Sequence, residues 1–158
     1  MRRLEGKVAV VTGGGGGIGS AVANRIVREG GKVVIADLFE DSARAAAGPL
    51  GDAALAIQFD ASDPASIEAM VTAAADHFGG IDILHNNAAM TDPAKHPLDT
   101  TPVDIPIEIW DEIIDINLRG YLLGCKYAIP HMIARGGGSI PSGSISIRRL
   151  SGVSGASG

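Results

Sequence analysis

The stretch from Thr12 to Gly19 constrains the fold of this chain more than any other feature. It reads Thr-Gly-Gly-Gly-Gly-Gly-Ile-Gly, follows the largely apolar run 7–11 and opens into the helical pattern 20–26. Glycine reaches positive φ and carries no Cβ, so a ligand can approach the backbone N–H groups closely. The start of a helix also offers a positive dipole end to an anion. The stretch therefore predicts a buried strand, a phosphate-binding glycine turn (residues 12–19) and a helix.

An acidic residue, Asp37, supplies the second half of this signal. It ends the next apolar run, 33–36, eighteen residues after Gly19. A carboxylate at that place can accept hydrogen bonds from both hydroxyls of an adenosine ribose. Five successive glycines could instead form a flexible low-complexity turn. The strand before them, the helix after them and the acid on the second strand favour a dinucleotide-binding site.

Apolar runs alternate with helical patterns along most of the chain, which is typical of βαβ units. We therefore expect an α/β fold of the Rossmann type, a doubly wound parallel sheet with helices on both faces. The expected strands are 7–11, 33–36, 53–59 and 81–84, and the expected helices are 18–29, 40–47, 64–78 with Asp63 as its cap, and 107–134. An irregular proline-rich loop should span 90–106, and Pro130 should kink the last helix.

The length of 158 residues suits one domain with a sizeable core. We expect a nucleotide-binding domain over residues 1–147 and a disordered tail over 148–158. Fourteen of the twenty-three residues from 136 to 158 are glycine or serine, which leaves few apolar groups to offset the entropy of ordering.

The spacing Thr-Gly-x-x-x-Gly-x-Gly resembles that of the short-chain dehydrogenase/reductase family. Asp60 after the third apolar run, the segment Asn86-Asn87-Ala88-Ala89 and Asn117 also match, with Ala89 in place of a family glycine. The resemblance runs from Lys7 to about Ile140. It implies that Asp60 contacts adenine and that the carbonyl of Asn117 holds a water of the proton relay.

The resemblance also implies a set of cofactor-binding residues. They are Gly13, Gly16, Gly17, Ile18, Gly19, Asp37, Leu38, Asp60, Ala61, Asn86 and Ala88. The expected cofactor is NAD, because a 2′-phosphate beside Asp37 would bring like charges together and neither Leu38 nor residues 14–16 supply a basic group.

The chain departs from the family pattern at the expected catalytic pair. No Tyr-x-x-x-Lys occurs, since Tyr121 precedes Cys125 by four positions and Tyr127 precedes His131 by four. In the family that tyrosine is the general acid/base, and a lysine lowers its pKa. We therefore expect the amino-terminal portion of an NAD-dependent oxidoreductase acting on a secondary alcohol or ketone, truncated after about the fifth strand. The alternative is a catalytically inactive truncated product that at most binds nucleotide.

The family's catalytic serine lies on the fifth strand, which here corresponds to the irregular stretch 139–149 with Pro141 and two adjacent arginines. Counting forward from residues 138–140 places it near Ser144 or Ile145, whereas counting back from a tyrosine just past Gly158 favours Ser146. We take Ser146, with Asn117, as the expected catalytic residues. The competing interpretation is an exposed serine in a disordered tail.

The charge and composition disfavour some classes of binding partner. A net charge of −5 disfavours a nucleic-acid surface, and no apolar run is long enough for a signal or a membrane span. The single cysteine, Cys125, suits a small core residue in a cytoplasmic protein. We expect a small-molecule substrate, and the resemblance implies pairing of full-length relatives through the helix matching 118–134.

Four possible metal ligands, His85, Asp92, His96 and Asp99, lie within one short region. Asp92 and His96 are four positions apart, but these residues fall on a strand end and in the proline-rich loop rather than on one face of a helix, and no C-x-x-C arrangement occurs. We therefore expect no metal site.

Overall fold

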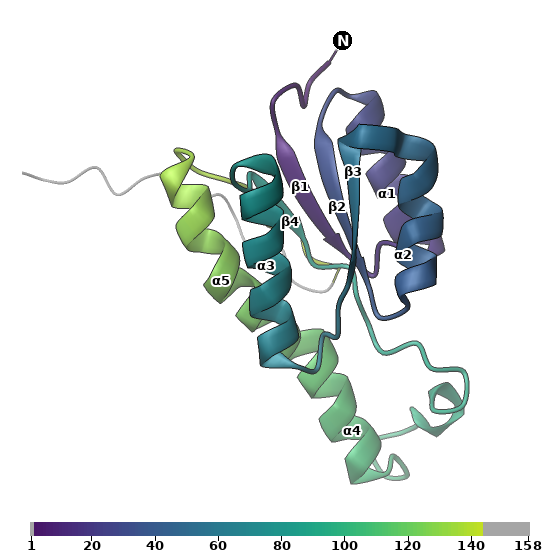
Figure 1. Cartoon of the computed structure of the whole chain (residues 1–158). Helices are drawn as coiled ribbons and strands as arrows, with labels where there is room; N and C mark the ends of the chain where they lie inside the picture. The colour runs from purple at the N-terminus through teal and green to yellow at the C-terminus, as the bar shows by residue number, and fades with distance from the viewer. Residues whose placement is uncertain (1, 144–158) are drawn as a thin grey trace, which may run out of the picture.

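The computed structural model describes residues 2–143, which form a parallel sheet with strand order β3-β2-β1-β4. Helices α1 and α2 cover one face of the sheet, and α3 and α5 cover the other (Figure 1). The predicted doubly wound α/β fold is confirmed. The elements are β1 (Val8–Thr12), α1 (Gly17–Arg28), β2 (Lys32–Asp37), α2 (Glu40–Ala47), β3 (Ala54–Gln58), α3 (Pro64–Phe78), β4 (Ile83–His85), α4 (Ile107–Ile114) and α5 (Gly120–Ala134), with short 3₁₀ turns at Gly48–Ala53 and His96–Leu98.

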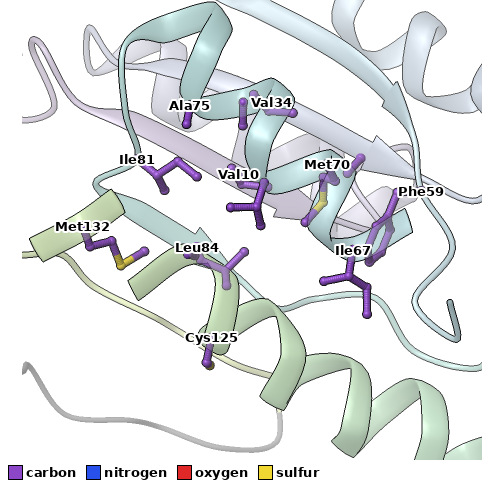
Figure 2. Packing of buried hydrophobic residues seen from close by; sticks show 14 of the residues in the cluster. Val10, Val34, Phe59, Ile67, Met70, Ala75, Ile81, Leu84, Cys125 and Met132 are labelled. Carbon is purple, nitrogen blue, oxygen red and sulfur yellow. The ribbon is translucent and has the colours of Figure 1, made fainter. Parts of the chain in front are cut away.

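The strands are continuous apolar runs because both faces of the sheet are covered. Every residue of β1 is buried, and Val10 pairs with Val34 on one side and Leu84 on the other. These side chains pack against α3 and α5, where Met70 and Cys125 close the core (Figure 2). The expectation that Cys125 is a core residue is confirmed, since only 7% of it is exposed.

Local signals set the ends of the helices as predicted. The side chain of Asp63 accepts a hydrogen bond from the backbone N–H of Ala65 and so caps α3. Gly79 ends the same helix in the left-handed conformation with φ of +79°. The bounds of α2 agree with the predicted 40–47, whereas β4 begins two residues later than the predicted 81.

The last predicted helix, 107–134, is divided by a turn that the sequence did not predict. The structure contains a π-helical turn at Asp115–Arg119 between α4 and α5, and α5 runs through Pro130 to Ala134. Pro130 lies near the end of the helix, so little helix follows the lost N–H donor. The π turn inserts an extra residue into the helical ladder and changes which side chains face the sheet.

Beyond α5, a fifth segment lies beside β4 without forming a regular strand. Two isolated parallel bridges join Ser139 to Ile83 and Ser142 to Asn86. Pro141 lacks a donor but its carbonyl accepts from the N–H of Asn86 at 3.0 Å, so the proline is accommodated at the edge of the sheet. The predicted tail, 148–158, lies outside the described residues.

One ion-pair cluster at the end of α1 leads to a testable pH dependence. Glu29 accepts hydrogen bonds from Arg3 at 3.2 Å and from Arg25 at 2.6 Å. Hydrogen bonds from Arg3, helped by the charges of Arg3 and Arg25, lower the pKa of Glu29 from its ordinary 4.5 to about 2. A carboxyl with a depressed folded pKa stabilises the fold above its unfolded pKa and loses that contribution as the pH falls.

We therefore expect the Tm to fall between pH 4.5 and about 2 through protonation of Glu29. Glu29→Gln should lower the Tm at pH 6 and make it less dependent on pH within this window. Thermal melts at several pH values measure this, with the exposed Glu68 replaced by Gln as the control. An unchanged pH dependence in Glu29→Gln would contradict the assignment.

Candidate functional site

The glycine turn joins the end of β1 to the start of α1. Gly13 has φ of +63°, and Gly16 precedes the helix with no side chain capping it. In any α-helix the first N–H groups have no partner within the helix. Here Gly17, Ile18 and Gly19 carry those groups. The turn therefore presents backbone donors and the positive end of a helix dipole at one place.

Close packing determines which glycines the turn requires. A Cβ on Gly19 would lie 2.3 Å from the carbonyl oxygen of Gly13, and a Cβ on Gly13 would lie 3.0 Å from the Cα of Ala88. Gly17 differs, because nothing lies within 4 Å of where its Cβ would stand. A side-chain atom at Gly17 would thus meet no protein atom, and the backbone donors of this helix start suit a phosphate group.

Asp37 ends β2 directly beside the glycine turn. Its Oδ2 accepts from the N–H of Gly15 at 2.9 Å, and its Oδ1 accepts from the N–H of Phe39 at 3.1 Å. Leu38 and Phe39 follow it with 52% and 67% of their surfaces exposed. An ionised carboxylate can accept more bonds than these two, so Asp37 can still accept from ribose hydroxyls. The sequence reasoning did not identify Phe39 as part of this edge.

The segment after β3 lies next to Asp37. The N–H of Phe59 donates to the carbonyl of Asp37 at 2.8 Å, which brings Asp60 and Ala61 to the same edge. The Oδ1 of Asp60 accepts from both the N–H and the hydroxyl of Ser62, at 2.8 and 2.7 Å. The two carboxylates predicted to contact adenosine therefore belong to adjacent, hydrogen-bonded segments.

Thr12 binds the segment after β4 to the glycine turn. Its hydroxyl donates to the carbonyl of His85 at 3.3 Å and accepts from the N–H groups of Asn87 and Ala88 at 3.0 and 3.1 Å. Asn87 in turn donates through Nδ2 to the carbonyls of Thr12 and Gly13. The sequence reasoning gave neither Thr12 nor the side chain of Asn87 this role, although both stand inside the quoted motifs.

Asn86 is buried where β4 meets the fifth segment, with 2% of its surface exposed. Its Nδ2 donates to the hydroxyl of Ser142 at 3.4 Å and contacts the sulfur of Cys125 at 3.8 Å. Burial raises the pKa of Cys125, so its thiol stays protonated at neutral pH. Asn86 thus links three elements beneath the site, and Cys125 is a packing residue.

The π turn brings Asn117 to the loop that follows β4. The Oδ1 of Asn117 accepts from the N–H of Met90 at 2.9 Å. Nearby, the hydroxyl of Tyr121 donates to the carbonyl of Ala88 at 2.8 Å, and burial raises the pKa of that tyrosine. Tyr121 is therefore held neutral by its surroundings, the opposite of what a general base needs. Ser146 and its alternative Ser144 lie outside the described residues.

Among the side chains that the structure describes, which do not include that of His96, no three His, Cys, Asp or Glu come together as metal ligands. The Nδ1 of His85 is buried with no hydrogen-bond partner among the described residues. Burial lowers the pKa of His85, so its ring is neutral at pH 7.

All of these segments follow strand ends, and in Figure 1 the arrowheads of the strands meet at the end from which α4 extends. The strand order reverses between β1 and β4, and in open α/β sheets ligands bind at the carboxyl edge beside such a reversal. The fold is therefore of the Rossmann class, and the edge that carries the glycine turn and Asp37 is its candidate dinucleotide site.

The chain belongs to the short-chain dehydrogenase/reductase family, since the family model for short chain dehydrogenase matches residues 7–145. It is 44% identical over 145 residues to a probable short-chain type dehydrogenase/reductase of Bradyrhizobium diazoefficiens, covering 89% of this chain and 50% of the relative. It is 45% identical over 136 residues to a sorbitol dehydrogenase of Cereibacter sphaeroides, covering 86% and 51%. The chain spans about half the length of these relatives.

Among solved structures, the fold is similar to a crystal structure of 3-ketoacyl-(acyl-carrier-protein) reductase from Brucella melitensis complexed with NADH. The TM-score is 0.79 and the identity 39%, with 87% of this chain and 56% of that chain covered. The reductase in that structure therefore binds a reduced nicotinamide dinucleotide.

Proposed function

We propose that this chain binds NAD(H) and forms the nucleotide-binding half of an oxidoreductase. The whole protein would transfer a hydride between NAD and a secondary alcohol or ketone. The observation that carries the proposal is the open helix start at Gly17, which ends a glycine turn that donates from the N–H of Gly15 to the carboxylate of Asp37. The fit of the site and the NADH complex of a similar reductase support it.

In this proposal each segment of the carboxyl edge holds one part of the nucleotide. The N–H groups of residues 17–19 bind the diphosphate, Asp37 accepts from the adenosine ribose, and Asp60 with Ala61 lies against adenine. Asn86 and Ala88 border the nicotinamide end. When bound, the dinucleotide supplies the hydride chemistry, and the chain supplies orientation and electrostatics.

We infer a preference for NAD over NADP from charge. A 2′-phosphate would stand next to the ionised Asp37, and like charges at such a distance repel. The exposed side chain beside it, Leu38, is apolar, and residues 14–16 are glycines. Nothing at these positions offers a cation to a 2′-phosphate.

Hydride transfer also needs a general acid/base to move a proton, and the residues of this chain do not supply one. No Tyr-x-x-x-Lys stands in the sequence, and Tyr121 is buried with its hydroxyl bonded to the carbonyl of Ala88. We therefore expect this polypeptide alone to bind nucleotide without turnover. Asn117 and Ser146 remain our proposed catalytic residues.

We further propose a small-molecule substrate, a cytoplasmic location and pairing of the whole protein with a second copy. The single cysteine, buried and protonated, supports a reducing compartment. Among residues 2–143 no helix is both long and apolar enough to cross a bilayer.

Calorimetric titration of the 158-residue chain with NADH and NADPH tests this function. We expect saturable binding of NADH and weaker binding of NADPH. An assay with NAD and a mixture of secondary alcohols should show no turnover for this polypeptide. Absence of heat with both NADH and NAD, for protein with a cooperative thermal melt, would refute the proposal.

A further inference from the structure

We infer that Gly120, at the junction between the π turn and α5, is a positioning residue for the adenosine end of the nucleotide site. Gly120 would act by fixing the position of the 60–62 loop, which follows β3. Gly120 itself would not touch the nucleotide. This inference rests on the proposed nucleotide binding and names a determinant of that same site.

The backbone conformation of Gly120 does not require a glycine. Its φ of −58° and ψ of −41° are ordinary helical values that any residue adopts, and glycine is among the poorest helix formers. The reason lies in the contact, because a Cβ on Gly120 would lie 2.6 Å from the carbonyl oxygen of Ala61. Both partners in that contact are backbone, so a side chain at 120 forces one element to move.

A second contact joins the same two segments. The Nη2 of Arg119 donates to the carbonyl of Ser62 at 3.4 Å. Ser62 in turn donates from its N–H and hydroxyl to Asp60, and the preceding Phe59 donates to the carbonyl of Asp37. The position of the 60–62 loop is therefore coupled to the carboxylate of Asp60 and to the backbone of Asp37, the two residues proposed to hold adenosine.

The π turn also contacts the opposite end of the site. Asn117 lies three residues before Gly120 in the π turn, and its side chain accepts from the N–H of Met90. One rigid helical segment thus sets the spacing between the 60–62 loop and the loop after β4. A displacement at Gly120 alone should disturb the adenosine end while the glycine turn keeps its own contacts.

The test compares Gly120→Ala with Gly48→Ala in the full chain. Gly48 is a matched control, since it also has helical angles, φ −50° and ψ −49°, and nothing within 4 Å of its Cβ position. We expect Gly120→Ala to weaken binding of NADH and of ADP-ribose by about tenfold or more, and Gly48→Ala to change neither beyond about twofold. Inorganic diphosphate, which probes the glycine turn alone, should bind both variants like the wild type.

Arg119→Ala is a second variant that adds no volume to the contact, and it serves if Gly120→Ala does not fold. We expect it to weaken ADP-ribose binding by about threefold with diphosphate binding unchanged. A folded Gly120→Ala that loses thermal stability but keeps wild-type affinity for ADP-ribose would show a purely structural role and overturn the inference. Equal losses for ADP-ribose and diphosphate would also overturn it. A wild-type chain that binds no NADH would instead refute the proposed function.

Discussion

Gly13→Val is expected to abolish NADH binding, raising the Kd by about 100-fold or more. Gly13 has φ of +63°, a conformation that a β-branched residue rarely adopts. Its Cβ would also lie 3.0 Å from the Cα of Ala88 and 3.2 Å from Nδ2 of Asn87. Valine would therefore push the glycine turn away from the segment that follows β4.

The control separates this effect from backbone strain. Gly51 has a similar φ of +59° but nothing within 4 Å of its Cβ position, so Gly51→Val carries strain away from the site. We expect it to bind NADH within about twofold of the wild type, by calorimetry on material checked by circular dichroism. A folded Gly13→Val that keeps wild-type affinity would show that the turn does not hold the diphosphate.

Gly17→Ala tests the same turn without disturbing the protein. Nothing lies within 4 Å of its Cβ position, and alanine suits a helix better than glycine. We expect an unchanged or higher Tm together with NADH binding weakened by about tenfold, because the methyl group enters the space beside the helix start.

The double variant Asp37→Ala with Leu38→Arg is expected to reverse the nucleotide preference, changing the ratio of the Kd values for NADH and NADPH by about 100-fold. Removing the carboxylate removes the repulsion of a 2′-phosphate, and a guanidinium at the exposed position 38 adds a bidentate partner. Asp37 also accepts from the N–H of Gly15, so NADH binding itself should weaken.

The matched control is Asp41→Ala, which removes an exposed carboxylate from the first turn of α2 and leaves Asp37 in place. Titrations of each variant with NADH and NADPH should show a changed ratio only in the double variant. If the ratio stays at its wild-type value, the ribose does not lie at Asp37.

Features carried by neighbouring residues could be predicted from the sequence. The glycine turn, the cap at Asp63 and the left-handed end at Gly79 follow from φ preferences and local hydrogen bonds, so their positions agree with the structure. The continuous apolar runs indicated a parallel sheet covered on both faces, because only that environment buries every residue of a strand.

Features that depend on distant contacts could not be predicted in the same way. The π turn at Asp115–Arg119 divides the single helix expected over 107–134, and no periodicity in that segment signals it. The hydroxyl of Thr12 serves three partners more than seventy residues away. The glycine motif identified the position of Thr12 but did not predict these hydrogen bonds.

The amino-acid order alone determined the α/β fold and the position of the candidate dinucleotide site, because glycine conformations, a strand-ending acid and apolar runs act over a few residues. Only the tertiary structure determined which residues at the carboxyl edge of the sheet contact one another. The backbone of Ala61 meets Gly120 at a distance that admits no Cβ, and Asn117 meets Met90 across a loop. Such contacts exist only once the sheet has brought its carboxyl ends together, since no local preference encodes the distance between two separate segments.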